Sequence, residues 1–305
     1  MEEKHRRRLL EIAVGDVRFD RPMRLYTSLR VGGVAAALVR AGSLEVLRDV
    51  CVYAAAHTIP RIVVGKGSNL LVSDRGFPGV VIRLRGALAE VRWEEEGELN
   101  AGGGATNRRI LDHCSREGIG GLEFLSGIPG TAGGAVATNA GARGRDTGEV
   151  LRRVELLTAE GTVDTLPSGE LRFSYRSCSL PEGAVVTRAV FHVRREAPEA
   201  VTKRIARNLS ERRRKQPLRF PSAGSVFRNP PEEPAWRLVE RAGLRGKRIG
   251  GAQISPLHAN FIVNSGGARA EDILSLMNLA RDEVLRLTGI ELEPEIRTVG
   301  FQNKR

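Results

Sequence analysis

The sequence predicts an α+β protein with two domains, of which the second is smaller and has an α/β pattern. First, a chain of 305 residues has room for about two domains. Second, short β-branched runs separated by glycines fill the first two-thirds and predict strands joined by tight turns. Third, the apolar spacing becomes helical near residue 197. We therefore expect one domain over residues 1–203, with subdomains at about 20–85 and 86–203, and a second domain over residues 204–305.

Strands and two helices make up the first domain in this prediction. Runs bounded by turn residues predict strands at residues 61–64, 79–84, 150–157, 162–166 and 184–194. Ser43 is a good N-cap for a helix whose apolar residues lie between 44 and 55. Thr106 caps a second helix in the same way, and Gly118 ends it.

Three helices and two strands are expected beyond residue 197, and together they form the smaller α/β unit. Pro198 begins a basic helix with an apolar stripe at every fourth residue, which runs into the charged segment 211–217. A short helix ends at Gly243, and a long helix with apolar residues between 273 and 287 ends at Gly289. Strands are expected around residues 259–263 and 295–299.

The composition excludes several classes of protein. Apolar residues make up 41% and charged residues 28%, as in ordinary globular proteins. No apolar run approaches the roughly 18 residues of a membrane span, and the polar start lacks the apolar core of a secretory signal. The three cysteines and five histidines have no metal-binding spacing. We expect a cytoplasmic protein with no metal site and no membrane insertion.

Basic residues outnumber acidic ones by 48 to 36, and only six of them are lysines. The simplest interpretation is a soluble surface in an arginine-biased genome. A second is an anionic small-molecule ligand, and a third is nucleic acid. We rank nucleic acid last, because aromatic residues are only 5% of the chain and do not alternate with basic ones.

Three glycine-rich loops point to a bound cofactor. They span residues 65–71, 101–106 and 121–141. Their backbone amides and lack of side-chain bulk suit a flat or phosphorylated ligand. The first loop has Leu70 at the third glycine position of a dinucleotide fingerprint, and Arg85 where an acid would follow, so it is not a Rossmann motif. Neither a P-loop nor a nucleophile elbow occurs.

Six segments in and beyond these loops resemble the UDP-N-acetylenolpyruvoylglucosamine reductase family of flavoproteins. They are residues 27–33, 65–72, 125–134, 173–177, 223–230 and 292–297, in the family's order. The resemblance implies an FAD-binding domain of the vanillyl-alcohol-oxidase type, with two subdomains. It also implies that NADPH reduces FAD, which then reduces UDP-N-acetylglucosamine enolpyruvate to UDP-N-acetylmuramate for peptidoglycan synthesis. All three tyrosines precede residue 176, so the chain resembles the short form that lacks a tyrosine-bearing loop.

The resemblance assigns the chemistry to three residues. Arg176 matches the family's catalytic arginine, and its guanidinium suits the carboxylate-centred charge that develops after hydride transfer. Glu295 matches the catalytic glutamate and acts as an acid if burial raises its pKa. Ser225 matches the proton donor, although a serine hydroxyl needs a partner to act as an acid. Arg297, two residues after Glu295, is expected on the same strand face.

The remaining family positions concern binding. FAD contacts are expected at Gly65, Lys66, Gly67, Ser68, Asn69, Leu70, Gly127, Ile128, Pro129, Gly130, Thr131, Gly134 and Asn139. Substrate contacts are expected at Tyr175, Lys215, Gly224, Asn229, Gln253 and Arg297. We expect a monomer whose partners are the UDP-sugar and NADPH, and not nucleic acid. The alternative function is an FAD-dependent oxidase or dehydrogenase of the same fold that acts on a sugar or hydroxy acid.

Overall fold

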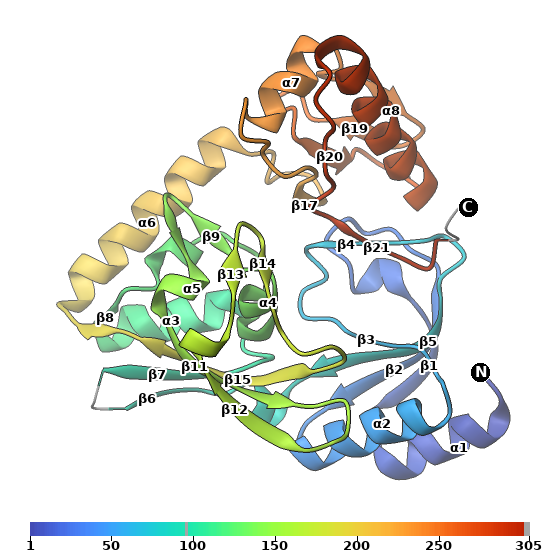
Figure 1. Ribbon diagram of the computed structural model, residues 1–305, viewed down its shortest axis with the longest axis vertical. Helices are drawn as coiled ribbons and strands as arrows, with labels where there is room; N and C mark the ends of the chain where they lie inside the picture. Colours follow the sequence, from blue (N-terminus) through green and yellow to red (C-terminus); the bar gives the residue numbers. More distant parts are fainter. Residues whose placement is uncertain (95–96, 302–305) are drawn as a thin grey trace. The chain divides into compact units, whose positions relative to one another are not determined.

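The protein consists of two compact units in a computed structural model that describes residues 1–94 and 97–301 (Figure 1). Unit 1 comprises residues 1–19, 36–66 and 79–211, and unit 2 comprises residues 20–35, 67–78 and 212–305. The units therefore divide at residue 211, not at the expected residue 203, and two segments from the N-terminal part of the chain belong to unit 2. In the described part of the chain, no helix is long and apolar enough to cross a membrane.

The first sheet of unit 1 has the strand order β1-β2-β5-β3. Its strands are β1 (Val17–Pro22), β2 (Val34–Ala41), β3 (Arg61–Val63) and β5 (Phe77–Leu84). Helices α1 (Glu3–Ile12) and α2 (Leu44–Ala56) pack together and bury Leu9, Leu47 and Val50 with the sheet residues Val80 and Ile82. The Ser43 hydroxyl caps α2 by accepting a hydrogen bond from the backbone N–H of Val46 at 3.3 Å, as predicted.

The second sheet of unit 1 has five antiparallel strands in the order β12-β11-β15-β7-β6. They are β6 (Val91–Glu94), β7 (Glu98–Gly102), β11 (Leu151–Leu157), β12 (Val163–Pro167) and β15 (Val185–His192). Helices α3 (Asn107–Glu117), α4 (Ala132–Ala137) and α6 (Pro198–Lys215) contribute residues to the same core. Thr106 caps α3, and Gly118 ends it in the left-handed conformation, as predicted.

Short elements connect these helices and strands. They are η1 (Met23–Leu25), β4 (Leu70–Val72), η2 (Gly86–Ala89), β8 (Ile119–Gly120), η3 (Glu123–Leu125), β9 (Gly141–Ala142), β10 (Arg145–Asp146), α5 (Thr147–Val150), η4 (Ser168–Glu170), β13 (Phe173–Ser174), β14 (Ser177–Cys178) and β16 (Arg194–Arg195). The expected strand at 184–194 is thus divided between β15 and β16, and β16 pairs with β8 instead of continuing in the large sheet.

Unit 2 has a four-stranded sheet in the order β17-β20-β19-β18. The strands are β17 (Ser222–Ser225), β18 (Arg248–Ile249), β19 (Ala252–Ile254) and β20 (Phe261–Asn264). Helices α7 (Ala235–Arg241) and α8 (Ala270–Thr288) share its apolar core, and Gly289 ends α8 with a φ of 71°. A final strand, β21 (Arg297–Val299), pairs in parallel with β4.

Packing explains why two early segments belong to unit 2. Leu29, Val31 and Leu71 are at most 3% exposed and lie in the same core as α7 and α8. The Asp74 carboxylate accepts hydrogen bonds from the first two backbone amides of α8, at 3.0 and 3.2 Å. The Asn264 side chain donates to the backbone carbonyl of Leu29 at 3.0 Å. These contacts join positions about 200 residues apart, which local sequence patterns cannot indicate.

Candidate active site

The three glycine-rich loops of the sequence meet at one hollow in unit 1. Its lining includes Gly65 and Lys66 from the first loop, Gly104 and Thr106 from the second, and Thr131 from the third. Val63, Val64, Arg83 and Leu84 complete the lining. The hollow thus combines main chain, two hydroxyls and two cationic side chains, a donor set that suits a phosphorylated ligand.

Close backbone approach explains the glycines at this hollow. A Cβ added to Gly65 would lie 2.6 Å from the Thr131 hydroxyl oxygen, and one added to Gly104 would overlap the backbone carbonyl of Leu84. The side-chain oxygen of Asn107 is buried nearby on the first turn of α3 and has no hydrogen-bond partner in the described structure. The two cationic side chains, the two hydroxyls and an unpaired buried acceptor fit the expected FAD.

The third loop is held by α3. Asn107, which is 1% exposed, donates its side-chain N–H to the carbonyl of Ile128 at 3.0 Å and its backbone N–H to the carbonyl of Gly130 at 3.1 Å. Gly127 has a φ of 77°, Pro129 is exposed, and the Thr131 hydroxyl caps α4 by accepting from the exposed Gly134. Sequence analysis missed Asn107, although its place directly after the predicted cap Thr106 could have indicated it.

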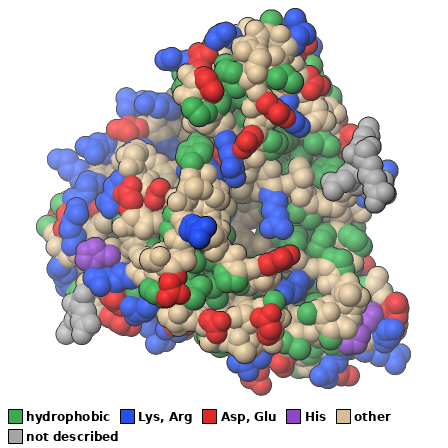
Figure 2. All heavy atoms as spheres, in the orientation of Figure 1, with side chains coloured by type: hydrophobic (Ala, Val, Ile, Leu, Met, Phe, Trp, Pro, Cys, Tyr) green, Lys and Arg blue, Asp and Glu red, His purple; other side chains and the backbone are tan. Residues whose placement is uncertain are grey.

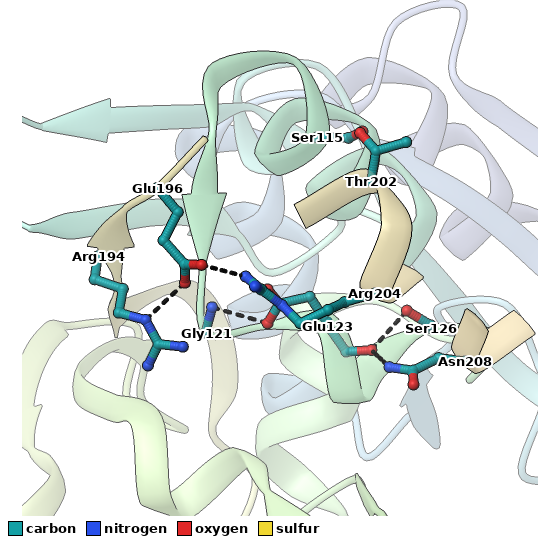
Figure 3. A network of polar contacts seen from close by, with 9 residues as sticks. All are labelled: Ser115, Gly121, Glu123, Ser126, Arg194, Glu196, Thr202, Arg204 and Asn208. Atoms are coloured by element: carbon teal, nitrogen blue, oxygen red, sulfur yellow. Dashed lines mark hydrogen bonds and ion pairs between the residues drawn. The ribbon is translucent and has the colours of Figure 1, made fainter. Parts of the chain in front are cut away.

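A polar network that includes α6 supports the start of the third loop (Figure 3). The Arg204 guanidinium on α6 donates to one Glu123 carboxylate oxygen at 2.9 and 2.6 Å, and to Glu196 at 2.7 Å. The other Glu123 carboxylate oxygen accepts the backbone N–H of Gly121 at 2.9 Å. The Glu123 carbonyl accepts the Asn208 side-chain N–H at 2.9 Å. Helix α6 therefore fixes the turn that leads into residues 127–131.

Burial alone would raise the pKa of Glu196, but hydrogen bonds from Arg204 and Arg194 outweigh it and hold the pKa below the usual 4.5. The carboxylate of Glu196 is therefore charged at neutral pH, as its two arginine partners require.

Arg176 lies at the tip of the β13–β14 hairpin of unit 1. Its φ of 59° is unusual for a residue with a side chain. Its guanidinium lies 5.0 Å from the centre of the Tyr175 ring, and the hydroxyls of Ser174 and Ser177 are 2.6 Å apart across the hairpin. Tyr175 is 48% exposed and Arg176 is partly buried. Part of the arginine side chain is therefore accessible at the tip of the hairpin.

Asn139 is placed differently from the other expected FAD residues. It is 3% exposed, and its side-chain N–H₂ group donates to the Asp146 carboxylate and to the carbonyl of Ser174, both at 3.1 Å. Its side-chain oxygen accepts the backbone N–H of Gly148 at 2.9 Å. The side chain of Asn139 is thus occupied by contacts within the protein.

Ser225 and Glu295 lie close together in unit 2. Ser225 ends β17 and is partly buried. The backbone N–H of Glu295 donates to the carbonyl of Val226, the residue after Ser225, at 2.8 Å. Gly224 has a φ of 79°, and nothing lies within 4 Å of the position of a Cβ there, so the main chain beside Ser225 is open. The segment before β21 therefore brings the expected acid beside the expected proton donor.

The expected strand face shared by Glu295 and Arg297 was wrong. Strand β21 begins only at Arg297, whose backbone N–H donates to the carbonyl of Asn69 at 3.1 Å. Glu295 instead pairs with Val226, and Pro294 before it has no N–H to continue a ladder. Arg297 is exposed and Glu295 is partly buried.

The first glycine-rich loop is divided between the units. Gly65 and Lys66 belong to unit 1, whereas residues 67–70 belong to unit 2. A Cβ on Gly67, which has a φ of 61°, would overlap the carbonyl of Tyr26, so its tight turn requires glycine. Ser68 is partly buried, and Leu70 pairs with Arg297 in the β4–β21 ladder. Residues 67–70 thus join the segment that carries Glu295.

The other expected substrate residues lie in unit 2 with varied surroundings. Lys215 is the exposed last residue of α6, whose final turn carries four basic residues. Figure 2 shows Lys and Arg side chains gathered along the edge of the view where α6 lies. The Asn229 side-chain oxygen accepts the backbone N–H of Ala235 at 3.1 Å, although the residue is exposed. Gln253 is partly buried and donates to the carbonyl of Gly246.

Comparison with known proteins agrees with this arrangement. Residues 35–166 match the model of an FAD binding domain family, and residues 216–299 match that of the UDP-N-acetylenolpyruvoylglucosamine reductase C-terminal domain. The reductase of Bacillus pumilus is 37% identical over 99% of this chain and 100% of its own length. That of Syntrophotalea carbinolica is 41% identical over 96% of this chain and 97% of its own length.

A solved structure leads to the same family. The crystal structure of the reductase from Thermus caldophilus is 37% identical, covers 93% of this chain and 99% of its own, and has a TM-score of 0.80. The predicted fold class, an FAD-binding domain followed by a smaller C-terminal domain, is confirmed. Because the relatives match over nearly their whole length, this chain belongs to the UDP-N-acetylenolpyruvoylglucosamine reductase family.

Proposed function

We propose that this FAD-dependent oxidoreductase reduces UDP-N-acetylglucosamine enolpyruvate to UDP-N-acetylmuramate, with NADPH as the reductant, in peptidoglycan precursor synthesis. Full-length similarity to the family supports the activity. The observation that supports the assignment of residues is the 2.8 Å hydrogen bond from the Glu295 backbone N–H to the carbonyl of Val226, because it joins the main-chain segments that carry Glu295 and Ser225. The alternative, an oxidase of the same fold, does not account for a C-terminal domain of the reductase type.

The reaction requires two additions to the enolpyruvyl double bond. The terminal carbon gains a hydride, the neighbouring carbon gains a proton, and the ether bond is retained. When bound, FAD supplies this hydride after taking it from NADPH. The residues at the hollow of unit 1, above all Gly65, Lys66 and Thr131, would hold the cofactor through main-chain and hydroxyl groups. The protein's own task is to stabilise the negative charge and deliver the proton.

Arg176 would stabilise the charge. After hydride arrives, negative charge spreads from the carbon into the adjacent carboxylate, which a guanidinium can bind through two parallel hydrogen bonds. The guanidinium stays protonated throughout, so it stabilises charge without donating the proton.

Ser225 would deliver the proton. A serine hydroxyl is a weak acid, and Glu295 is the neighbouring group that can orient it or replenish its proton. The open main chain at Gly224 leaves space for the sugar beside the hydroxyl. Lys215 and Asn229 would bind the diphosphate, with Gln253 and Arg297 as further contacts. We further propose that the enzyme works in the cytoplasm as a monomer. Cell shape and cell division would depend on it through peptidoglycan synthesis.

Two measurements test the function. The purified protein should be yellow, with oxidised-flavin absorption, and should oxidise more than one equivalent of NADPH per flavin only when the enolpyruvyl UDP-sugar is present. Mass spectrometry should show a product two hydrogens heavier than the substrate. Rapid oxygen consumption with a simple sugar, without UDP-sugar reduction, would favour the oxidase alternative. A colourless protein that binds DNA or RNA in a strongly salt-dependent way would favour the nucleic-acid alternative.

A further inference from the structure

The hairpin that carries Arg176 needs support from outside. Its ladder pairs Phe173 with Cys178 and Ser174 with Ser177, and one more backbone hydrogen bond runs from Ser179 to the carbonyl of Arg172 at 3.0 Å. Such a short hairpin is not stable by itself. The positive φ of Arg176 adds backbone strain, which persists only where the surroundings hold the conformation in place. The position of the guanidinium therefore depends on whatever holds the hairpin.

Asn139 supplies that support through its side-chain amide. One hydrogen of the N–H₂ group goes to the carbonyl of Ser174, the last residue before the hairpin turn, and the other goes to the Asp146 carboxylate. The oxygen accepts from Gly148, at the start of α5. Phe173 packs against Gly148, since a Cβ there would lie 2.7 Å from the Phe173 ring. Asn139 thus joins α4, α5 and the hairpin at one buried point.

These contacts leave the amide no donor for a ligand. An asparagine N–H₂ group has two hydrogens, and both are used within the protein. We propose that Asn139 is a positioning residue for Arg176 and that its side chain does not bind FAD. The inference rests on the proposed function, in which Arg176 stabilises the charge on the substrate.

Asn139→Asp is the sharpest variant. Aspartate has the same shape, tolerates the φ of 40° at this position, and keeps an acceptor for Gly148. It replaces the donor with an oxygen that faces the Asp146 carboxylate and the Ser174 carbonyl, so both contacts are lost.

A second variant covers the case in which Asn139→Asp fails to fold. Adding Asp146→Asn restores a donor–acceptor pair between the two side chains but leaves the Ser174 carbonyl without its donor. Thr138→Ala, one residue away, is the matched control, because the Thr138 hydroxyl donates to the carbonyl of Gly134 at 2.8 Å.

The first readout needs no cofactor. In FAD-free protein, hydrogen exchange followed by mass spectrometry should show residues 172–179 exchanging about 2- to 10-fold faster in Asn139→Asp and in the double variant, the effect of one lost hydrogen bond. Thr138→Ala should leave that segment unchanged. Unchanged exchange in the Asn139 variants would overturn the inference.

The second readout separates cofactor binding from chemistry. In Asn139→Asp, the FAD dissociation constant and the rate of flavin reduction by NADPH should stay within about threefold of wild type, whereas reoxidation by the enolpyruvyl substrate should slow roughly 10- to 100-fold. The double variant Asn139→Asp with Arg176→Ala should reoxidise with the substrate no more slowly than Arg176→Ala alone. A large loss of FAD affinity with normal reoxidation of the reloaded enzyme would make Asn139 a cofactor ligand and overturn the inference.

The same experiments show which proposal fails. If Arg176→Ala slows reoxidation and Asn139→Asp does not, only the inference about Asn139 is wrong. If Arg176→Ala itself reoxidises at the wild-type rate, the proposed role of Arg176 is wrong, and the inference falls with it.

Discussion

Replacing Arg204 with methionine tests whether α6 holds the cofactor loop of unit 1. Methionine retains much of the aliphatic length of arginine but removes three hydrogen bonds, two to Glu123 and one to Glu196. The Glu123 side chain is 10% exposed, so its carboxylate would stay buried with the Gly121 amide as its one remaining hydrogen-bond partner in the described structure. Glu196 would keep Arg194.

These contacts set the expected magnitude. Removing one partner of a buried ion pair typically costs about 3–5 kcal/mol, because a charge is left buried without compensation. Arg204 is 32% exposed and Glu196 retains one arginine, so we expect a smaller loss of about 2–4 kcal/mol in the free energy of unfolding. Because the carbonyl of Glu123 also anchors the loop, FAD affinity should fall as well.

Urea unfolding of the FAD-free protein measures the loss directly. Arg207→Met, on the exposed face of the same helix, is the matched control and should change stability by less than about 0.5 kcal/mol. Adding Glu123→Gln to Arg204→Met removes the stranded charge, so the double variant should be more stable than Arg204→Met alone. Equal stabilities of Arg204→Met and Arg207→Met would refute this reasoning.

Three further predictions concern the proposed chemistry, substrate charge and pH. Ser225→Ala should bind FAD and be reduced by NADPH at nearly the normal rate, but its reduced flavin should reoxidise with substrate about 10²–10⁴ times more slowly. Stopped-flow absorbance checks this, and reoxidation within a few-fold of wild type would exclude Ser225 as the donor. Lys215→Ala should raise the substrate KM more than it slows flavin reduction, whereas efficient competition by nucleic acid at ordinary salt would argue against a nucleotide-sugar role. Two hydrogen bonds from Arg153, at 2.9 and 2.8 Å, hold the pKa of Glu98 below the usual 4.5. The pair therefore stabilises the fold above about pH 4.5, and this contribution disappears as the pH falls through the lowered pKa. Glu98→Gln should thus cost about 0.5–1 kcal/mol at pH 7 and progressively less in acid, measured by urea unfolding, and a pH-independent difference would contradict the assignment.

Local signals in the sequence predicted most helix ends correctly. Ser43 and Thr106 cap their helices, and Gly118 and Gly289 end theirs, because capping depends on a few neighbouring residues. The start of β21 was missed because it depends on pairing with β4, more than 200 residues away.

Contacts between residues far apart in the sequence also determine the side-chain arrangement of the candidate site. Asn139 was expected to contact FAD, but only the structure shows that its side chain is hydrogen-bonded to Ser174, Asp146 and Gly148. The ion pair between Arg204 and Glu123 could not be predicted from the sequence either, since 81 residues separate the two. By contrast, the glycine pattern around Gly65 predicted the hollow well, because glycine is required wherever backbones approach closely.

The alternation of the chain between its two units has a consequence for synthesis on the ribosome. Leu29, Val31 and Leu71 emerge early, yet the core that covers them is completed by residues after 212. At about 5–20 residues per second, roughly 10–50 seconds pass between the synthesis of these apolar residues and that of the last residues of the core. A nascent chain of this protein therefore presents a chaperone-binding surface throughout that interval, and a stalled or truncated product would keep it exposed.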